Sequence, residues 1–223
     1  MNSLRQKFAC SPELARIAPL GVYAVLTFLQ GDLGPQSLYW LYVVKTLLGA
    51  WILWQVRPFV PEMRWSISWE AVVVGAAIFA LWVGLDGLYP RLTQPKALAN
   101  PIQQFGAGSF AAWSYILVHI AGMSIVVPPV EEIFYRSFLY RYLVKIDFCS
   151  MPLNQFHGLS FVVTSVLFGL MHPDRWLAGI ICGLAYQWLV IHKNRLGDAM
   201  SAHAITNFLL GVWIVWKGAW QFW

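Results

Sequence analysis

The chain has 223 residues, of which 59% are hydrophobic, 16% aromatic and only 11% charged, and its mean hydropathy is +0.59. Since about a quarter of the residues in a typical soluble domain are charged, this composition excludes a disordered chain and argues against a soluble globule. The formal net charge is +5, but the basic residues are scattered through short loops, so we expect no nucleic-acid partner. Basic loops between apolar segments are typical of membrane insertion. The sequence predicts an all-α, polytopic integral membrane protein.

Apolar segments in chain order define the predicted helices. The first, at 17–29, follows several basic residues. It lacks a clear signal-peptide cleavage site, and further apolar segments follow, so we expect a retained first helix. The next candidate spans lie at 38–56, 69–88 and 110–127. Each has close to the 20 or so residues that cross a bilayer.

In the second half, Pro128 and Pro129 are predicted to break or kink the chain. A charged helical stretch at 130–144 follows them. Three more apolar segments lie at 158–172, 175–192 and 198–216. The count is seven spans if 110–127 and 130–144 form one kinked helix, and eight if they are separate. We expect a single membrane domain, 1–223, with accessory helices at 1–109 and a core at 110–223 that holds the last four helices.

Charged residues orient the predicted spans. Basic residues before the first span, together with Arg57 and Arg64, favour a cytoplasmic N-terminus. The basic segment 192–195 should also be cytoplasmic, which agrees with seven spans. Lys45 interrupts a span and either snorkels or faces another helix, whereas Glu70 and Asp86 lie near helix ends, where charge costs less. The three cysteines, Cys10, Cys149 and Cys182, form no CxxC pair and indicate neither a disulfide framework nor a zinc site.

Polar residues inside membrane helices are candidate functional sites by default. The first group is Glu131-Glu132-Ile-Phe-Tyr-Arg136. Glu132 and Arg136 are four residues apart and share a helix face, so they are predicted to pair. Glu131 points about 100° away and is free to act as a general base or acid. The ordinary structural interpretation of this group is a solvated ion pair at a helix end.

Two further groups follow on separate apolar helices. Phe168 lies one turn before His172, and His203 lies one turn before Asn207. His203 and Asn207 can point into one cavity and supply a proton and an oxyanion donor. A helix cap at His172 and a helix–helix hydrogen bond at the last pair are the structural alternatives. Together the three groups supply a base, a second proton carrier and oxyanion donors, which is the residue set of a hydrolase.

The order EExxxR, FxxxH and HxxxN, over roughly residues 125–216, resembles the signature of the CAAX protease and bacteriocin-processing family of intramembrane proteases. The C-terminal half is also similar to CAAX-protease-related proteins found with bacterial exosortase (PEP-CTERM sorting) systems. The resemblance implies a glutamate-type intramembrane endopeptidase. In it, Glu131 and His172 would activate a water molecule, while His203 and Asn207 would stabilise the oxyanion. The supporting residues would be Glu132, Arg136 and Phe168.

The resemblance also implies partners and a location. It implies no cofactor, although the residues alone leave open a zinc site at Glu131, His172 and His203. The expected partners are the bilayer and a membrane-embedded peptide or protein, such as a sorting-signal peptide, in a bacterial inner membrane, with a functional link to an exosortase system. Two other classes stay open. One is a non-proteolytic scaffold or immunity-type protein that binds a peptide or partner helix, and the other is a proton-relay transporter.

The predicted helices pose one geometric difficulty for a site shared by His172 and His203. If the late helices are simple alternating spans, His172 lies toward one side of the membrane and His203 toward the other. At 1.5 Å per residue, this predicts about 10–15 Å of depth between two residues that must share a site. Helix tilting or an irregular segment that lines a cavity would close this gap.

Overall fold

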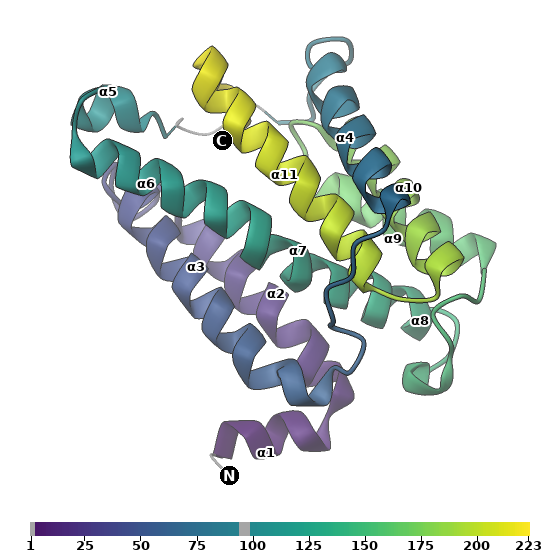
Figure 1. The fold of residues 1–223 in the computed structure, drawn as a ribbon. Coiled ribbons are helices and arrows are strands. Elements are labelled where there is room, and N and C mark those ends of the chain that lie inside the picture. The colour runs from purple at the N-terminus through teal and green to yellow at the C-terminus, as the bar shows by residue number, and fades with distance from the viewer. Residues whose placement is uncertain (1–2, 94–98) are drawn as a thin grey trace.

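The computed structural model describes residues 3–93 and 99–223, and these residues contain helices and no strand. Figure 1 shows the helices in chain order from purple to yellow. They are α1 (Ser3–Cys10), α2 (Pro12–Leu29), α3 (Ser37–Val56), α4 (Trp69–Gly84), α5 (Pro101–Phe105), a continuous helix from α6 to α8 (Phe110–Tyr142), α9 (Gly158–Leu170), α10 (Trp176–Lys193) and α11 (Gly197–Lys217). The predicted all-helical membrane fold is confirmed.

Four helical segments of the described chain are long and apolar enough to cross a membrane: Pro12–Leu29, Ser37–Phe59, Phe110–Tyr142 and Gly197–Lys217. The apolar helices α4 and α9 are shorter. All the predicted helical regions form helices. By length and composition, however, the described residues give four candidate spans, fewer than the seven or eight predicted from apolar segments alone.

Pro128 and Pro129 do not interrupt the helix that contains them, which we call the composite helix (Phe110–Tyr142). The segment just before them, Gly122–Val126, is a π-helix, and the Val127 N–H donates to the Gly122 carbonyl. Because proline cannot donate to a carbonyl four residues back, a wider turn at this point lets the helix continue. The sequence left open whether 110–127 and 130–144 form one kinked helix or two separate helices. The structure has one helix, Phe110–Tyr142. A second π segment, Ile133–Leu139, follows the two glutamates.

Glycines set the distance between α9 and α10. A Cβ atom at Gly183 would lie 2.8 Å from the Cα of Ser165, and one at Gly179 would lie 2.8 Å from the Cα of Gly169. Gly179 and Gly183 are four residues apart, the small-xxx-small spacing that allows membrane helices to approach closely. This contact holds Phe168 on α9 against the rest of the bundle.

Helix α4 packs against α11 in the same close manner. A Cβ atom at Gly75 would lie 2.7 Å from the Ala202 carbonyl oxygen. The Thr206 hydroxyl donates to the Gly75 carbonyl over 2.8 Å. Both contacts flank His203, so α4 fixes the part of α11 that carries this residue.

The charged residues noted within spans have partners. Lys45 is buried and faces the C-terminal end of α2, where its Nζ lies 2.7 Å from Gln30 Oε1. Of the two expectations for Lys45, the one that it faces another helix is correct. Glu70 and Asp86 lie at the ends of α4, as predicted. Glu70 pairs with Lys193 at 2.9 Å, and Asp86 pairs with Arg91 at 2.9 Å.

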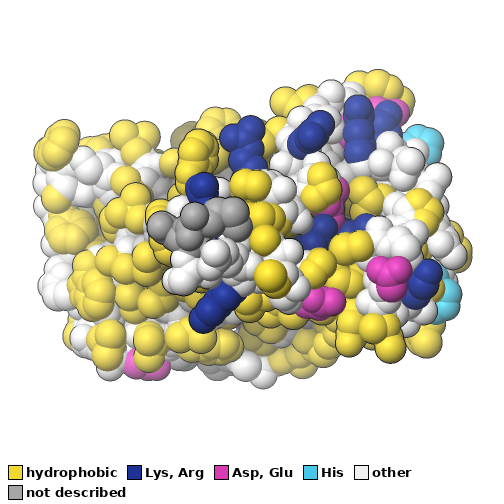
Figure 2. Space-filling view, turned by 90° about the horizontal axis from the view of Figure 1, so that it is seen from below, with side chains coloured by type: hydrophobic (Ala, Val, Ile, Leu, Met, Phe, Trp, Pro, Cys, Tyr) yellow, Lys and Arg dark blue, Asp and Glu magenta, His cyan; other side chains and the backbone are white. Residues whose placement is uncertain are grey.

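Ion pairs join basic residues of separate helices to acidic residues at one end of the molecule. Glu62 accepts from Arg16 at 2.7 Å and from Arg141 at 2.8 Å. The Lys193–Glu70 pair ties the end of α10 to the start of α4. Figure 2 looks onto the end of the molecule where α1 lies and shows dark-blue Lys and Arg side chains spread among yellow hydrophobic ones. The segments predicted to be cytoplasmic thus meet on one side.

Candidate active site

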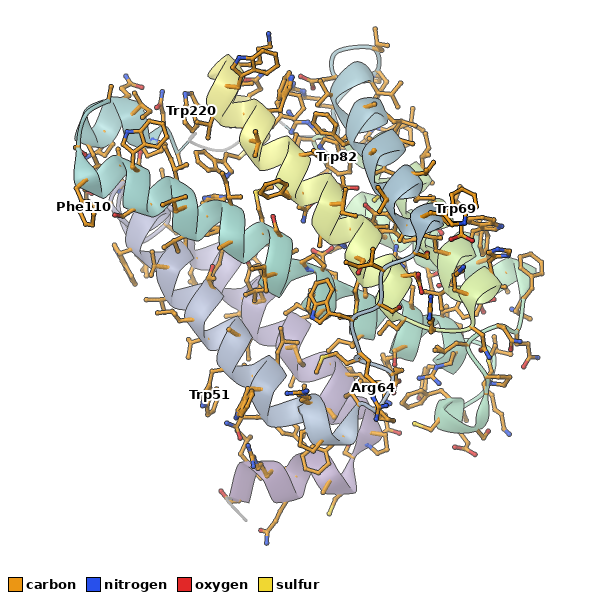
Figure 3. The ribbon with its side chains drawn as sticks, viewed as in Figure 1. Trp51, Arg64, Trp69, Trp82, Phe110 and Trp220 are labelled. Carbon is orange, nitrogen blue, oxygen red and sulfur yellow. The ribbon has the colours of Figure 1, made fainter. Side chains whose placement is uncertain are left out.

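A cavity of about 710 Å³ lies inside the bundle, lined by residues from α2, α4, the composite helix, α9, α10 and α11. Five of the seven predicted site residues line it: Glu131, Phe168, His172, His203 and Asn207. The other two, Glu132 and Arg136, do not line it and are buried beside it. Figure 3 shows Trp82, another lining residue, pointing from α4 toward α11. The structure therefore gathers residues from distant helices around one space.

Glu132 is the central residue of a series of contacts that we call the charge chain, which runs from Arg136 through Glu132 and His203 to Glu131. Its Oε2 lies 3.2 Å from Arg136 Nε, so the predicted pair is present. Its Oε1 lies 3.0 Å from His203 Nδ1, a contact between the composite helix and α11 that the sequence did not predict. Neither Glu132 nor Arg136 is more than 2% exposed. Opposite charges held this closely offset part of the cost of burying each of them.

His203 lies between two carboxylates. While Nδ1 faces Glu132, its Nε2 lies 3.9 Å from Glu131 Oε2. Glu131 is partly open to the cavity, with 16% of its side chain exposed. The histidine beside Glu131 is therefore His203, and His172 forms no ion pair with Glu131 in the part of the chain that the structure describes.

His172 is oriented by the helix that precedes it. Its Nδ1 lies 2.9 Å from the Phe168 carbonyl oxygen. Because a carbonyl can only accept, Nδ1 carries a proton, and in the neutral form of the ring Nε2 is an acceptor. The ring of Trp82 meets the His172 ring edge-on, with centroids 5.5 Å apart. His172 is therefore fixed in both tautomer and direction at the cavity wall.

The ring of Phe168 lies beside both histidines. Its centroid lies 5.1 Å from that of His172 and 6.1 Å from that of His203. The Arg136 guanidinium lies 4.4 Å from the same ring, within the range of a cation–π contact. Phe168 thus contacts Arg136 and both histidines.

Helix α9 is shorter than the thickness of a bilayer core. This helix has 13 residues and is about 20 Å long, whereas the hydrocarbon core of a bilayer is about 30 Å thick. His172, just past its end, lines the same cavity as His203. The separation in depth expected for simple alternating spans therefore does not keep the two histidines from one cavity.

The side chain of Asn207 binds a backbone carbonyl that the prolines leave without a donor. Its Nδ2 donates to the Met123 carbonyl over 2.7 Å. In a π-helix this carbonyl would bond to residue 128, which is a proline and has no N–H. Asn207 therefore satisfies an acceptor that the backbone leaves unpaired, and one amide hydrogen remains for another partner.

Sequence reasoning missed two aromatic residues of the site. Tyr186 stacks on His203 with ring centroids 5.2 Å apart and donates its hydroxyl to Thr206 Oγ1 over 2.7 Å. It is the one tyrosine in the apolar segment 175–192. Its hydroxyl group, which is polar in an otherwise apolar helix, could have marked it as a candidate site residue. Trp82 offered no signal, because its contact with His172 depends on how distant helices pack.

The structure does not bring Glu131, His172 and His203 together as the zinc site that the sequence alone left open. Among the described residues, no three His, Cys, Asp or Glu side chains lie close enough together to hold a metal ion. His203 approaches Glu131, whereas the Nδ1 of His172 is directed to the Phe168 carbonyl. The three side chains therefore do not fit a zinc ion in this arrangement.

Fold and cavity define an all-helical membrane protein with a polar site inside its bundle. Residues 113–209 match the family model described as type II CAAX prenyl endopeptidase Rce1-like. No curated protein and no solved structure matches the chain significantly. The matched region contains all seven predicted site residues, and over it the chain carries a domain of this protease family. The predicted family is thus confirmed, whereas the likeness to exosortase-associated proteins stays a prediction.

Proposed function

We propose that this protein is an intramembrane endopeptidase of the CAAX-protease type, in which Glu131 activates a water molecule for attack on a peptide bond. The observation that carries the proposal is the charge chain from Arg136 through Glu132 and His203 to Glu131, which ends at the cavity. A carboxylate at the open end of a fixed, buried chain is arranged as a general base would be.

The 3.9 Å gap between Glu131 and His203 is where we place the water. His203 donates from Nδ1 to Glu132, so in its neutral form Nε2 is an acceptor that faces a second acceptor, Glu131. A water molecule beside this gap can donate one hydrogen to each of them. Its lone pairs then point away from both groups, toward a peptide carbonyl in the cavity.

The proton route follows from this placement. As the water oxygen bonds to the carbonyl carbon, one of its protons passes to Glu131. The carbonyl oxygen becomes an oxyanion, and the remaining amide hydrogen of Asn207 is available to it. When the C–N bond breaks, Glu131 returns the proton to the leaving nitrogen. Both hydrogens of this water are taken by Glu131 and His203, so His172, which also lines the cavity, does not bind it directly in this placement, and its expected part in water activation stays a prediction.

The substrate class is limited by the membrane setting. Amide bonds in a spanning helix are already hydrogen-bonded, so a segment must unwind before it is cut. We therefore propose a terminal or juxtamembrane segment of a membrane-anchored or sorting-signal peptide as substrate. We further propose a multi-pass location in a bacterial inner membrane, a functional link to an exosortase system, and hydrolysis without a metal cofactor.

The second candidate is a non-proteolytic scaffold or immunity-type protein with the same fold. The cavity would then bind a peptide or a partner helix without cutting it. The contacts of Asn207 and Glu132 also serve helix packing, which favours keeping this alternative. It predicts that Glu131 can be replaced without loss of function.

A comparison of protein termini in cells separates these candidates. Cells would carry wild-type protein, Glu131→Gln or the control Glu70→Gln at matched levels, and the termini of membrane and secreted proteins would be mapped. Glu70 pairs with Lys193 at the start of α4, outside the cavity. We expect one or a few proteins to keep a segment in Glu131→Gln that they lose in the other two strains. Identical termini in all three strains would favour the scaffold.

A further inference from the structure

A second cavity lies at the basic end of the molecule, away from the catalytic residues. It has a volume of about 590 Å³. Three arginines from separate segments line it: Arg5 of α1, Arg57 after α3, and Arg64 of the following loop. Trp54, with 61% of its surface exposed, forms part of the rim. Figure 3 shows Arg64 at the lower end of the bundle, on the side of α1.

The positive charge of this cavity is not neutralised. No acidic residue lines it, and none of the three arginines forms an ion pair within the described ranges 3–93 and 99–223. Glu62, in the same loop, is taken up by Arg16 and Arg141. Arg5 donates from Nε to Gln55 Oε1 over 2.7 Å, which holds its side chain in place. Three guanidinium groups around one space form a site for a multiply oxygenated anion such as a phosphate.

An apolar cavity of about 590 Å³ continues from the basic one. The two share four lining residues, Trp54, Arg57, Met63 and Arg64. The far side of the apolar cavity is formed by Ile125, Val126 and Pro129 of the composite helix. Ile125 is 61% exposed on the surface, so the groove is open toward the surroundings of the helix bundle.

We propose that these joined cavities bind an anionic phospholipid. The phosphate would contact Arg5, Arg57 and Arg64, and an acyl chain would lie in the apolar groove against Ile125. Tryptophans at a membrane–water interface, as at Trp54, are typical of the depth at which headgroups lie. Anionic lipids are concentrated at membrane faces that carry basic protein segments. The order of the two cavities, cationic and then apolar, matches the order of headgroup and chain.

Native mass spectrometry of the full-length protein in neutral detergent tests the headgroup part. Dioleoyl phosphatidylglycerol would be titrated against dioleoyl phosphatidylcholine, with wild type, Arg57→Gln/Arg64→Gln and a charge-matched control, Lys7→Gln/Lys145→Gln. Neither control lysine lines the cavities. We expect phosphatidylglycerol to bind the arginine variant at least about tenfold more weakly than the control. Equal binding of both lipids, or equal loss in both variants, would overturn the proposal.

A second variant tests the acyl groove without changing charge. Ala50 lines the groove, and Ala50→Trp should fill it. We expect this variant to bind dioleoyl phosphatidylglycerol several-fold more weakly and the short dihexanoyl lipid as the wild type does. If chain length has no effect, or if millimolar inorganic phosphate displaces the long-chain lipid fully, the site is a simple anion site and the lipid proposal fails.

Discussion

Arg136 is held by three kinds of contact within the bundle. It pairs with Glu132, lies 4.4 Å from the Phe168 ring, and donates to the Gly183 carbonyl over 3.4 Å. Its side chain is 2% exposed. A guanidinium in such a place counters the charge of Glu132, which would otherwise be buried with only His203 beside it.

Replacing Arg136 should therefore destabilise the protein through the charge left behind. We expect Arg136→Met to lower the free energy of unfolding by about 3–5 kcal/mol, the usual cost of breaking a buried ion pair from one side. Adding Glu132→Gln should restore part of the loss, because the uncompensated charge is then gone. Unfolding by a denaturing detergent in mixed micelles measures both. A loss below about 1 kcal/mol in Arg136→Met would contradict this role.

Asn207 is predicted to act on the reaction as well as on packing. In the proposed mechanism, Asn207→Ala removes an oxyanion donor, which typically costs 10²–10³-fold in kcat. KM should change little, because the donor acts on charge that develops in the transition state. Kinetics on the substrate found by terminal mapping would measure both constants. A raised KM with unchanged kcat would mean that Asn207 acts on substrate binding and not on the oxyanion, which would contradict this role.

At the scale of helices, the approach of α9 to α10 depends on glycines. We expect Gly183→Ala to cost about 1–3 kcal/mol, because the added methyl would overlap Ser165 in a packed interface. Gly21→Ala in α2 is the matched control, since nothing lies within 4 Å of its Cβ position. That change should be neutral or stabilise by up to about 1 kcal/mol. Equal effects in detergent unfolding would show that the close contact carries no stability.

Some of these elements were predictable and others were not. Apolar runs place the helices, and four-residue spacings place Glu132 beside Arg136 on one face. The sequence could not show that a π turn carries the helix through Pro128 and Pro129, because proline alone predicts either a break or a kink. Nor could it bring His203 to Glu132, since that contact depends on how α11 packs against the composite helix.

Across the whole molecule, the buried Glu62 cluster joins α2, the loop after α3 and the composite helix. Glu62 accepts from Arg16, Arg141 and the Ser137 hydroxyl. Burial by itself would raise the pKa of Glu62, but Arg16 and the Ser137 hydrogen bond outweigh it, so the pKa lies below its ordinary value of 4.5. A lowered carboxyl pKa stabilises the fold above the unfolded-state pKa, and this stability is lost as the pH falls.

This cluster predicts a pH dependence of stability. As the pH falls from 7 to below about 4, wild-type protein should lose more unfolding free energy than Glu62→Gln does. At pH 7, Glu62→Gln should be the less stable of the two, because Arg16 and Arg141 lose their shared partner. Thermal unfolding in detergent across this range provides the comparison. Parallel curves for the two proteins would contradict a stabilising role for ionised Glu62.

The central claim, hydrolysis by a water activated at Glu131, is tested most directly by isotope incorporation. Membranes that hold wild-type or Glu131→Gln protein would be incubated in water enriched in ¹⁸O, and the C-termini formed during incubation would be mapped by mass spectrometry. The account predicts specific C-termini with one ¹⁸O from solvent in wild-type membranes and none of these in Glu131→Gln membranes. The same labelled termini in equal amounts in both would contradict it.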